Sequence, residues 1–148
     1  MAVRYDQPNA AARAANALIG WLAELGISVA GTRALRVRGR KTGKSRGVVV
    51  NVLTIDGVDY LVSPRGNTQW VRNVRAAGIV DMGPRWRRRK LSTTEVADGA
   101  KADLLKRYLD RWYWEVKGHI AGLTPDSNDD ELHAAAPSIP VFALANAG

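Results

Sequence analysis

The fold is decided by the segment GRKTGKSRGVVVNVLTIDG, which spans residues 39–57. Residues 39–44 combine two glycines with basic and hydroxyl side chains, a composition typical of a tight turn. Residues 47–55 contain a nearly continuous β-branched run, which predicts a strand buried on both faces. The next two residues, Asp56 and Gly57, are a signal for a two-residue hairpin. The segment therefore predicts a turn, a strand and a hairpin, which together begin an antiparallel sheet.

Further strands and helices are expected on both sides of this segment. Apolar and basic residues alternate in 34–38, as in a half-buried strand with an arginine face, and 58–63 is the hairpin partner. The other expected strands are 79–82, 90–96 and 139–145, and the expected helices are 9–25, 68–77, 98–118 and a short acidic one between Ser127 and Pro137. About six strands and three or four helices without regular β–α alternation predict an α+β fold on an antiparallel sheet or barrel. The length of 148 residues indicates a single domain over 1–148.

Two of the helices carry clear start and stop signals. Asn67 or Thr68 can cap the helix that ends before Gly78, a residue suited to a left-handed C-terminal position. Asp98 is expected to cap the longest helix. That helix carries one apolar stripe, which consists of Leu105, Tyr108, Leu109, Trp112 and Val116.

The N-terminal helix, residues 9–25, places Leu18, Trp21, Leu22 and Leu25 on one face. We expect this face to pack on or near the barrel, and the alternative is a weak contact with a membrane surface. Polar residues interrupt the stretch, so it has neither the apolar run of a membrane span nor the layout of a signal peptide. A cytoplasmic protein, with membrane association as the alternative, is therefore expected.

Composition excludes several kinds of chemistry. The chain has no cysteine, which rules out disulfides, thiolate nucleophiles and Cys-ligated zinc. It has only two histidines, His119 and His133, so no multi-histidine metal site is expected. No nucleophile stands out, and no catalytic residue is assigned. If the protein is an enzyme, a bound organic cofactor supplies the chemistry.

The positive charge is concentrated in the middle of the chain. Residues 33–90 hold fifteen basic and three acidic residues, a net charge of +12, whereas the rest of the chain has a net charge of −4. A basic middle in an acidic frame indicates one anionic partner.

Two loops are candidates to bind that partner. Residues 39–46 combine glycines, which expose backbone N–H groups, with a threonine and four basic side chains. Residues 63–70 join the end of a strand to the capped start of a helix. The alternatives are a solvated hairpin turn and an ordinary strand-to-helix connection.

The basic run from Arg85 to Lys90 surrounds Trp86 and could hold phosphates and stack a base. A small nucleic-acid-binding module is therefore one alternative function. The run lies where a hairpin is expected, however, so a solvated turn is favoured and no nucleic acid is expected as a partner. Trp112 is expected in the core, and Tyr113 and Trp114 beside it.

The two loops together resemble a known family. Gly39-Arg40-Lys41-Thr42-Gly43, with Arg46 opening a valine-rich strand, is similar to the deazaflavin (F420)-dependent nitroreductases of actinobacteria. Ser63-Pro64-Arg65-Gly66, followed by Trp70 and Asn73 as Trp-x-x-Asn, matches the same order. The strand that begins Ile139-Pro140-Val141 resembles the last strand of that family.

The resemblance implies a split β-barrel of the FMN-binding split-barrel-like superfamily, with peripheral helices and coenzyme F420 as cofactor. By this likeness Arg40, Lys41, Thr42 and Arg46 hold the phosphate and nearby tail, and Val48 belongs to the same cofactor site. Likewise Ser63, Pro64, Arg65 and Gly66 border the deazaflavin, while Trp70 and Asn73 support that wall. FMN is the alternative cofactor, as in an FMN-binding split-barrel oxidoreductase, and no metal is implied.

The implied reaction is hydride transfer from the reduced deazaflavin to an electrophilic small molecule such as a nitroarene, quinone or enone. The likeness also favours a monomer. Residues 119–137 contain no tyrosine, whereas family members often carry several there, and this leaves the substrate open. The accompanying proton is expected from solvent or from a hydroxyl such as that of Ser63.

Overall fold

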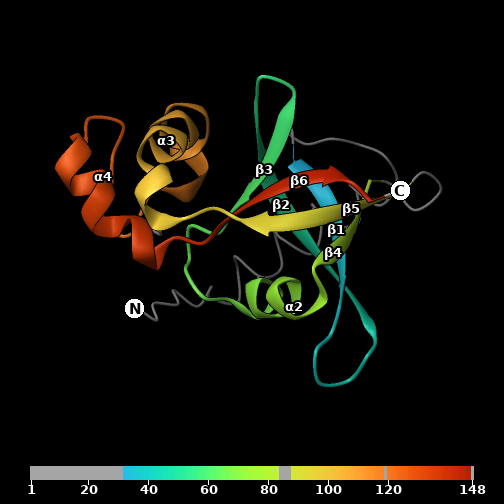
Figure 1. Cartoon of the computed structure of the whole chain (residues 1–148). Coiled ribbons are helices and arrows are strands. Elements are labelled where there is room, and N and C mark those ends of the chain that lie inside the picture. The colour runs from blue at the N-terminus through green and yellow to red at the C-terminus, as the bar shows by residue number, and fades with distance from the viewer. Residues whose placement is uncertain (1–31, 84–87, 119, 148) are drawn as a thin grey trace.

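Six antiparallel strands form a closed barrel in the structure of this chain, a computed structural model that describes residues 32–83, 88–118 and 120–147. The strands follow the order β1-β2-β3-β6-β5-β4, and β4 pairs back onto β1 (Figure 1). Their bounds are β1 Thr32–Arg38, β2 Ser45–Ile55, β3 Val58–Val62, β4 Ile79–Met82, β5 Arg89–Glu95 and β6 Val141–Asn146. The expected α+β split β-barrel with peripheral helices is therefore confirmed.

The β2–β3 hairpin is the one that the Asp56-Gly57 signal predicts. Asp56 has φ +50° and Gly57 has φ +81°, the left-handed values that a tight hairpin turn requires at both central residues. Val52 of β2 faces Leu61 of β3 in the resulting register. The turn that the sequence suggested thus fixes the pairing of the two strands.

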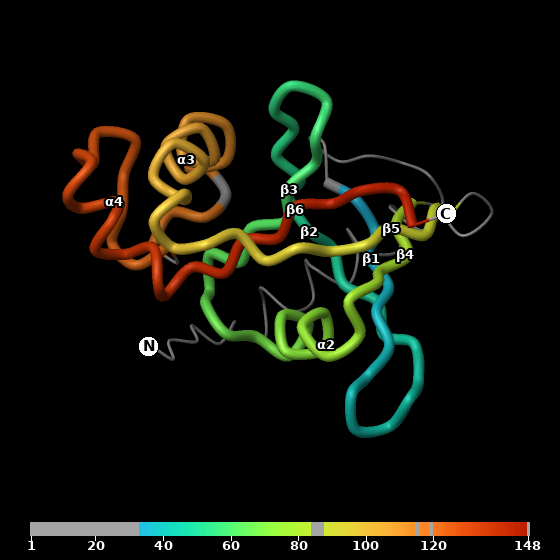
Figure 2. The backbone as a smooth tube through the Cα atoms, viewed as in Figure 1, coloured from blue at the N-terminus to red at the C-terminus, as the bar shows by residue number. Residues whose placement is uncertain are grey.

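Alternate side chains along the strands serve two separate cores. Val50 and Leu61 point into the barrel, whereas Leu53 and Val62 point outward into a second core. The expected burial of residues 47–55 on both faces is wrong, because only Val50 and Leu53 are buried, Gly47 and Thr54 are exposed and the others are half-buried. The first part of β2, residues 45–47, is exposed. This part of β2 extends beyond the barrel into the β1–β2 hairpin, as the tube in Figure 2 shows.

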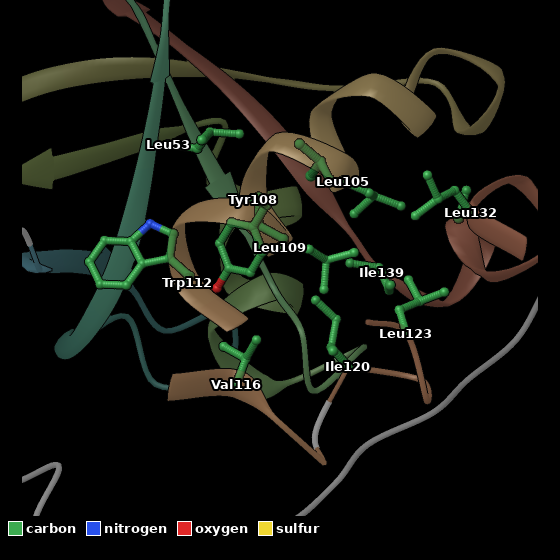
Figure 3. Close-up of a cluster of buried hydrophobic side chains, with 13 residues drawn as sticks. Leu53, Leu105, Tyr108, Leu109, Trp112, Val116, Ile120, Leu123, Leu132 and Ile139 are labelled. Carbon is green, nitrogen blue, oxygen red and sulfur yellow. The ribbon is translucent and has the colours of Figure 1, made fainter. Parts of the chain in front are cut away.

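The second core lies between the barrel wall and two helices, α3 (Ala102–Val116) and α4 (Asp129–Ala135) (Figure 1). The apolar stripe expected on the longest helix is at its centre, as Figure 3 shows. The Trp112 indole N–H also donates to the Val52 carbonyl at 3.3 Å, which fixes α3 against β2. The expectation that Trp112 belongs to the core is confirmed, while Trp114 is 61% exposed.

Helix α2, Gln69–Ala77, lies across the end of the barrel from which the β1–β2 hairpin projects (Figures 1 and 2). The Thr68 hydroxyl oxygen caps it by accepting the Val71 N–H. Gly78 ends it with φ +70°, and its N–H donates to the Val74 carbonyl. Val71 and Val74 are fully buried in the barrel core, so α2 closes this end. Both of the sequence signals for this helix are thus confirmed.

The start of α3 differs from the expectation. Asp98 does not cap it, because the chain first makes a short 3-10 turn, η1 (Asp98–Ala100), and α3 begins at Ala102. The Asp98 carboxylate instead accepts from the ammonium of Lys101 at 2.8 Å. Lys101 is only 2% exposed, and its ammonium also donates to the Ala136 carbonyl at 2.9 Å. The carboxylate is therefore used by a buried lysine rather than by the backbone N–H groups of the helix.

The short acidic helix is present where it was expected. The Asn128 side chain accepts the Glu131 N–H at 2.8 Å, and the Glu131 carboxylate accepts the Asn128 N–H at 3.0 Å, which forms a capping box. A second 3-10 turn, η2 (Ala136–Ser138), then leads into β6.

The expected N-terminal helix over 9–25 lies outside the described residues. Among the helices that are described, none combines the length and apolar character needed to cross a membrane.

Candidate functional site

The β1–β2 hairpin loop, residues 39–44, is folded tightly on itself. The Gly39 N–H donates to the Lys44 carbonyl at 2.8 Å, and the Gly43 N–H donates to the Gly39 carbonyl at 2.9 Å. Gly43 has φ +71°, a conformation that favours glycine. The N–H groups of Lys41 and Thr42 donate to none of the described residues, so they are available to a ligand.

Gly39 is closely surrounded by other atoms of this loop. A Cβ atom at Gly39 would lie 2.9 Å from the Thr42 hydroxyl oxygen, 3.3 Å from the Lys44 carbonyl oxygen and 3.6 Å from Arg46 Nε. The position therefore admits only glycine without movement of its neighbours. The hydroxyl of Thr42 and the guanidinium of Arg46 therefore both lie close to Gly39.

Positive charge is concentrated around the loop. Residues 38–46 contain five basic residues and no acidic one. Lys41, Lys44 and Arg46 are exposed, and none of them forms an ion pair with a described residue. The arrangement is that of an anion site, in which backbone donors and free cations converge.

Arg46 and Val48 face the barrel interior side of β2. Val37 pairs with Arg46, and Leu35 pairs with Val48, so both residues share a face with buried members of the barrel core. Val48 is half-buried and packs against that core, while Arg46 lies beyond it on the projecting part of the strand. One face of β2 thus runs from the apolar core to the charged loop.

The second loop, residues 63–68, forms a turn at the end of β3. The Ser63 N–H donates to the Pro140 carbonyl at 2.9 Å, and the Gly66 N–H donates to the Ser63 carbonyl at 3.1 Å. Ser63 is 1% exposed, and its hydroxyl donates to the Gly66 carbonyl at 2.6 Å. Gly66 has φ +92°, so the tight turn requires glycine there. Pro64 and Arg65 at the tip are half-buried.

Helix α2 connects the two loops through Asn73. Its amide oxygen accepts both the Arg40 backbone N–H at 3.1 Å and an Arg40 guanidinium N–H at 2.8 Å. Asn73 is 4% exposed, so the bonds lie in a site largely shielded from water. The residue that the family likeness assigned to the cofactor wall therefore holds the first loop in place.

Trp70, one turn before Asn73, lies against the barrel core. Its ring is 6.4 Å from that of Phe142 at an interplanar angle of 55°, and the residue is half-buried. The structure thus places an aromatic ring on α2, the helix that follows the second loop and bonds to the first loop through Asn73.

One group of residues was missed by the sequence analysis. Arg75 donates from Nε and Nη2 to the two carboxylate oxygens of Glu95, at 2.9 and 2.7 Å, and from Nη1 to the Asn67 amide oxygen at 2.8 Å. The hydrogen bonds to Glu95 raise the pKa of Arg75 above its ordinary value, so the guanidinium stays charged at any working pH. No sequence signal could have found this contact, because it joins α2 to the distant strand β5.

Other predicted features lie apart from this site. His133 is exposed on α4, and His119 is outside the described residues. Of the basic run, the structure describes Arg88, Arg89 and Lys90, which lie at the start of β5. Within residues 32–83, 88–118 and 120–147, no group of three or more His, Asp or Glu residues could hold a metal ion.

A comparison with known proteins identifies the family of this chain. A family model described as F420H(2)-dependent quinone reductase matches residues 11–116. None of the curated proteins matches the chain.

Three solved structures share the fold. An F420-H2 dependent reductase is 19% identical over 78% of this chain and 94% of its own, with a TM-score of 0.53. An F420 reductase is 16% identical over 84% of this chain and 93% of its own, with a TM-score of 0.50. A protein described as a domain-swapped dimer is 17% identical over 92% of this chain and all of its own, with a TM-score of 0.55. At these identities the likeness shows the fold alone.

Proposed function

Since the chain belongs to the F420H2-dependent quinone reductase family, we propose that it binds F420H2 between its two loops and reduces an electrophilic small molecule with it. The acceptor class is that of quinones, enones and nitroarenes. The observation that carries the proposal is the β1–β2 loop beside α2, where backbone donors and exposed cations converge that have no partner among the described residues.

The residues of the first loop fit the anionic part of F420, which carries a phosphate and an oligoglutamate tail. The Lys41 and Thr42 N–H groups suit a phosphate oxygen. The exposed charges of Lys41, Lys44 and Arg46 suit the carboxylates that follow. The Asn73 bonds hold Arg40 at the base of the loop before any ligand arrives, which lowers the ordering cost of binding.

The second loop and Trp70 fit the flat ring system of the deazaflavin. The turn is rigid, because Ser63 and Gly66 bond each other through both backbone and side chain. Pro64 and Arg65 present its tip, and the Trp70 ring is supported from behind by Phe142. A rigid wall of this kind orients a planar group and excludes water from one of its faces.

When bound, F420H2 supplies a hydride, and the acceptor takes up that hydride with one proton. The protein's part is to hold donor and acceptor in contact with their orbitals aligned. Ser63 is a poor proton source, because its hydroxyl hydrogen is engaged by the Gly66 carbonyl and the residue is buried. We therefore propose solvent as the source of the proton.

Titration of F420 fluorescence with the protein tests this proposal. The wild type is expected to bind F420 more tightly than FMN or a single-stranded oligonucleotide. The double variant Lys41→Ala/Arg46→Ala should bind at least about tenfold more weakly, since each charge-assisted bond is worth roughly 1.5–3 kcal/mol.

The matched control is Arg89→Ser/Lys90→Ser, which also removes two exposed cations but does so on β5. It should leave the F420 affinity within a few-fold. Equal weakening by both double variants would show that net charge rather than the hairpin loop binds the ligand. Tighter binding of FMN than of F420 would contradict the proposal and indicate FMN as the cofactor.

The cytoplasmic location and the monomeric state remain part of the proposal. Light scattering after size-exclusion chromatography would measure the oligomeric state directly, and a dimer would contradict it.

A further inference from the structure

We infer that Arg75 is a positioning residue, whose guanidinium fixes the 63–68 loop by tying Asn67 to Glu95 of β5. The inference rests on the proposed function only where it assigns that loop to the deazaflavin. The link itself is a property of this chain's own residues.

All three nitrogen atoms of the Arg75 guanidinium donate hydrogen bonds in this contact. The pair with Glu95 is bidentate, with two nearly equal bonds of 2.9 and 2.7 Å, and the third bond, 2.8 Å long, reaches the Asn67 amide oxygen. A planar fork with five donors can make these bonds together, whereas an ammonium cannot reproduce their geometry. Arg75 therefore sets the distance between the loop and the strand.

The link closes a circuit of hydrogen bonds around the loop. At its beginning, the Ser63 N–H donates to the Pro140 carbonyl, immediately before β6. The next residue, Val141, accepts the N–H of Val96, which directly follows Glu95. At the end of the loop, Asn67 is tied to Glu95 through Arg75. Both ends of the loop are thus anchored to the same end of the β5–β6 pair.

The pair is too exposed to contribute much to global stability. The side chains of Arg75 and Glu95 are 34% and 39% exposed, and exposed ion pairs are worth little. Helix α2 is already held by its Thr68 cap, by Gly78 and by two fully buried valines. The expected effect of Arg75 is therefore local and lies in the loop.

A matched ion pair on α3 provides a control that distinguishes an effect of Arg75 on the loop from the general effect of removing a surface guanidinium. Arg107 donates to Asp103 at 3.0 Å, with side-chain exposures of 54% and 73%. This pair is formed within α3 and touches neither loop, so Arg107→Gln serves as the control for removal of a surface guanidinium.

Hydrogen–deuterium exchange without any ligand is the first test. Arg75→Gln and Asn67→Ala should each speed exchange in the peptide that contains the Gly66 and Thr68 amides by about fivefold, the effect of losing roughly 1 kcal/mol of local bonding. The double variant should exchange no faster than the quicker single variant, because both changes break one link. Arg75→Lys should resemble Arg75→Gln, and Arg107→Gln should resemble the wild type. Unchanged exchange in the single variants, or additive effects in the double variant, would overturn the inference.

Titration of F420 is the second test. Arg75→Gln should weaken F420 binding by about fivefold with a melting temperature close to that of Arg107→Gln. Unchanged affinity in Arg75→Gln together with faster loop exchange would remove the loop from the cofactor site and so overturn the positioning role. Absence of F420 binding by the wild type would refute the proposed function, while the exchange result would still decide whether the link exists.

Discussion

Ser63 and Asn73 show how a single side chain can shape a candidate site through bonds to the protein's own chain. Both are almost fully buried, and both use their polar atoms on the chain itself, Ser63 on Gly66 and Asn73 on Arg40. Buried polar groups that are satisfied in this way fix the geometry around them. The family likeness selected these residues, but only the contacts show that they act on the loops.

Ser63→Ala provides a test at this scale. The variant loses the bond to the Gly66 carbonyl and should loosen the turn, with kcat lowered by less than about tenfold. Loss of a general acid would instead cost roughly 10²–10⁴-fold. Steady-state oxidation of F420H2 by a quinone, with folding checked by circular dichroism, measures the difference. A folded variant with a loss in the larger range would make Ser63 the proton donor.

At the scale of elements, the β1–β2 hairpin shows what a sequence can reveal. Its glycines, its basic residues and the valine run after it are all local signals, and they predicted the turn and the strand pair. The burial of β2 was predicted wrongly, because an apolar run does not reveal that only Val50 and Leu53 would be covered by the two cores. Asp98 likewise carried a local capping signal, which the distant Ala136 carbonyl and the buried Lys101 overrode.

The residues proposed to bind the cofactor likewise divide into those with a local sequence signal and those defined by distant contacts. The loop sequences and the Trp-x-x-Asn pattern pointed to the two loops, since each is a short contiguous stretch. The contacts of Asn73 with Arg40 and of Arg75 with Glu95 span 33 and 20 positions. The spacing of residues in the sequence does not reveal these contacts, because the folding of the barrel brings the residues together.

Gly39→Ala tests the hairpin as an element. The added methyl group would approach the Thr42 hydroxyl oxygen to 2.9 Å, and the overpacking should cost about 1–3 kcal/mol. We expect F420 binding at least about fivefold weaker in a fluorescence titration. Gly99→Ala is the control, since a Cβ there meets no atom within 4 Å. Wild-type affinity in Gly39→Ala would show that F420 binding does not depend on the tight packing of the loop at Gly39.

At the scale of the whole molecule, the barrel and the helical layer are joined at Lys101. Its ammonium connects η1, which follows β5, to η2, which precedes β6, so one side chain ties together both passages between the barrel and the helices. The group is buried, but its charge is compensated by Asp98, and the Ala136 carbonyl gains a donor.

Lys101→Met tests this connection. The methionine keeps the apolar stem but removes the charged donor to the Ala136 carbonyl, which still accepts the Ile139 N–H at 3.1 Å. Loss of this charge-assisted bond should lower the free energy of unfolding by about 1–3 kcal/mol. Lys106→Met, at an exposed position of the same helix, should change it by less than about 0.5 kcal/mol. Urea denaturation of both variants gives the comparison. Equal stability of the two variants would mean that the bonds of Lys101 do not stabilise the connection between the barrel and the helical layer.

The alternation of β3 and β6 between the two cores limits how this protein can vary in length. Leu61 and Phe142 face each other inside the barrel, and the neighbouring pair, Val62 and Val141, faces the helices. Neither strand has a side that is free of packing. Deletion of one residue from β3 would therefore turn the side chains beyond the deletion from one core to the other, and both cores would be disrupted at once. Substitutions can be absorbed here one side chain at a time, whereas insertions and deletions have to occur in the turns and loops at the ends of the strands.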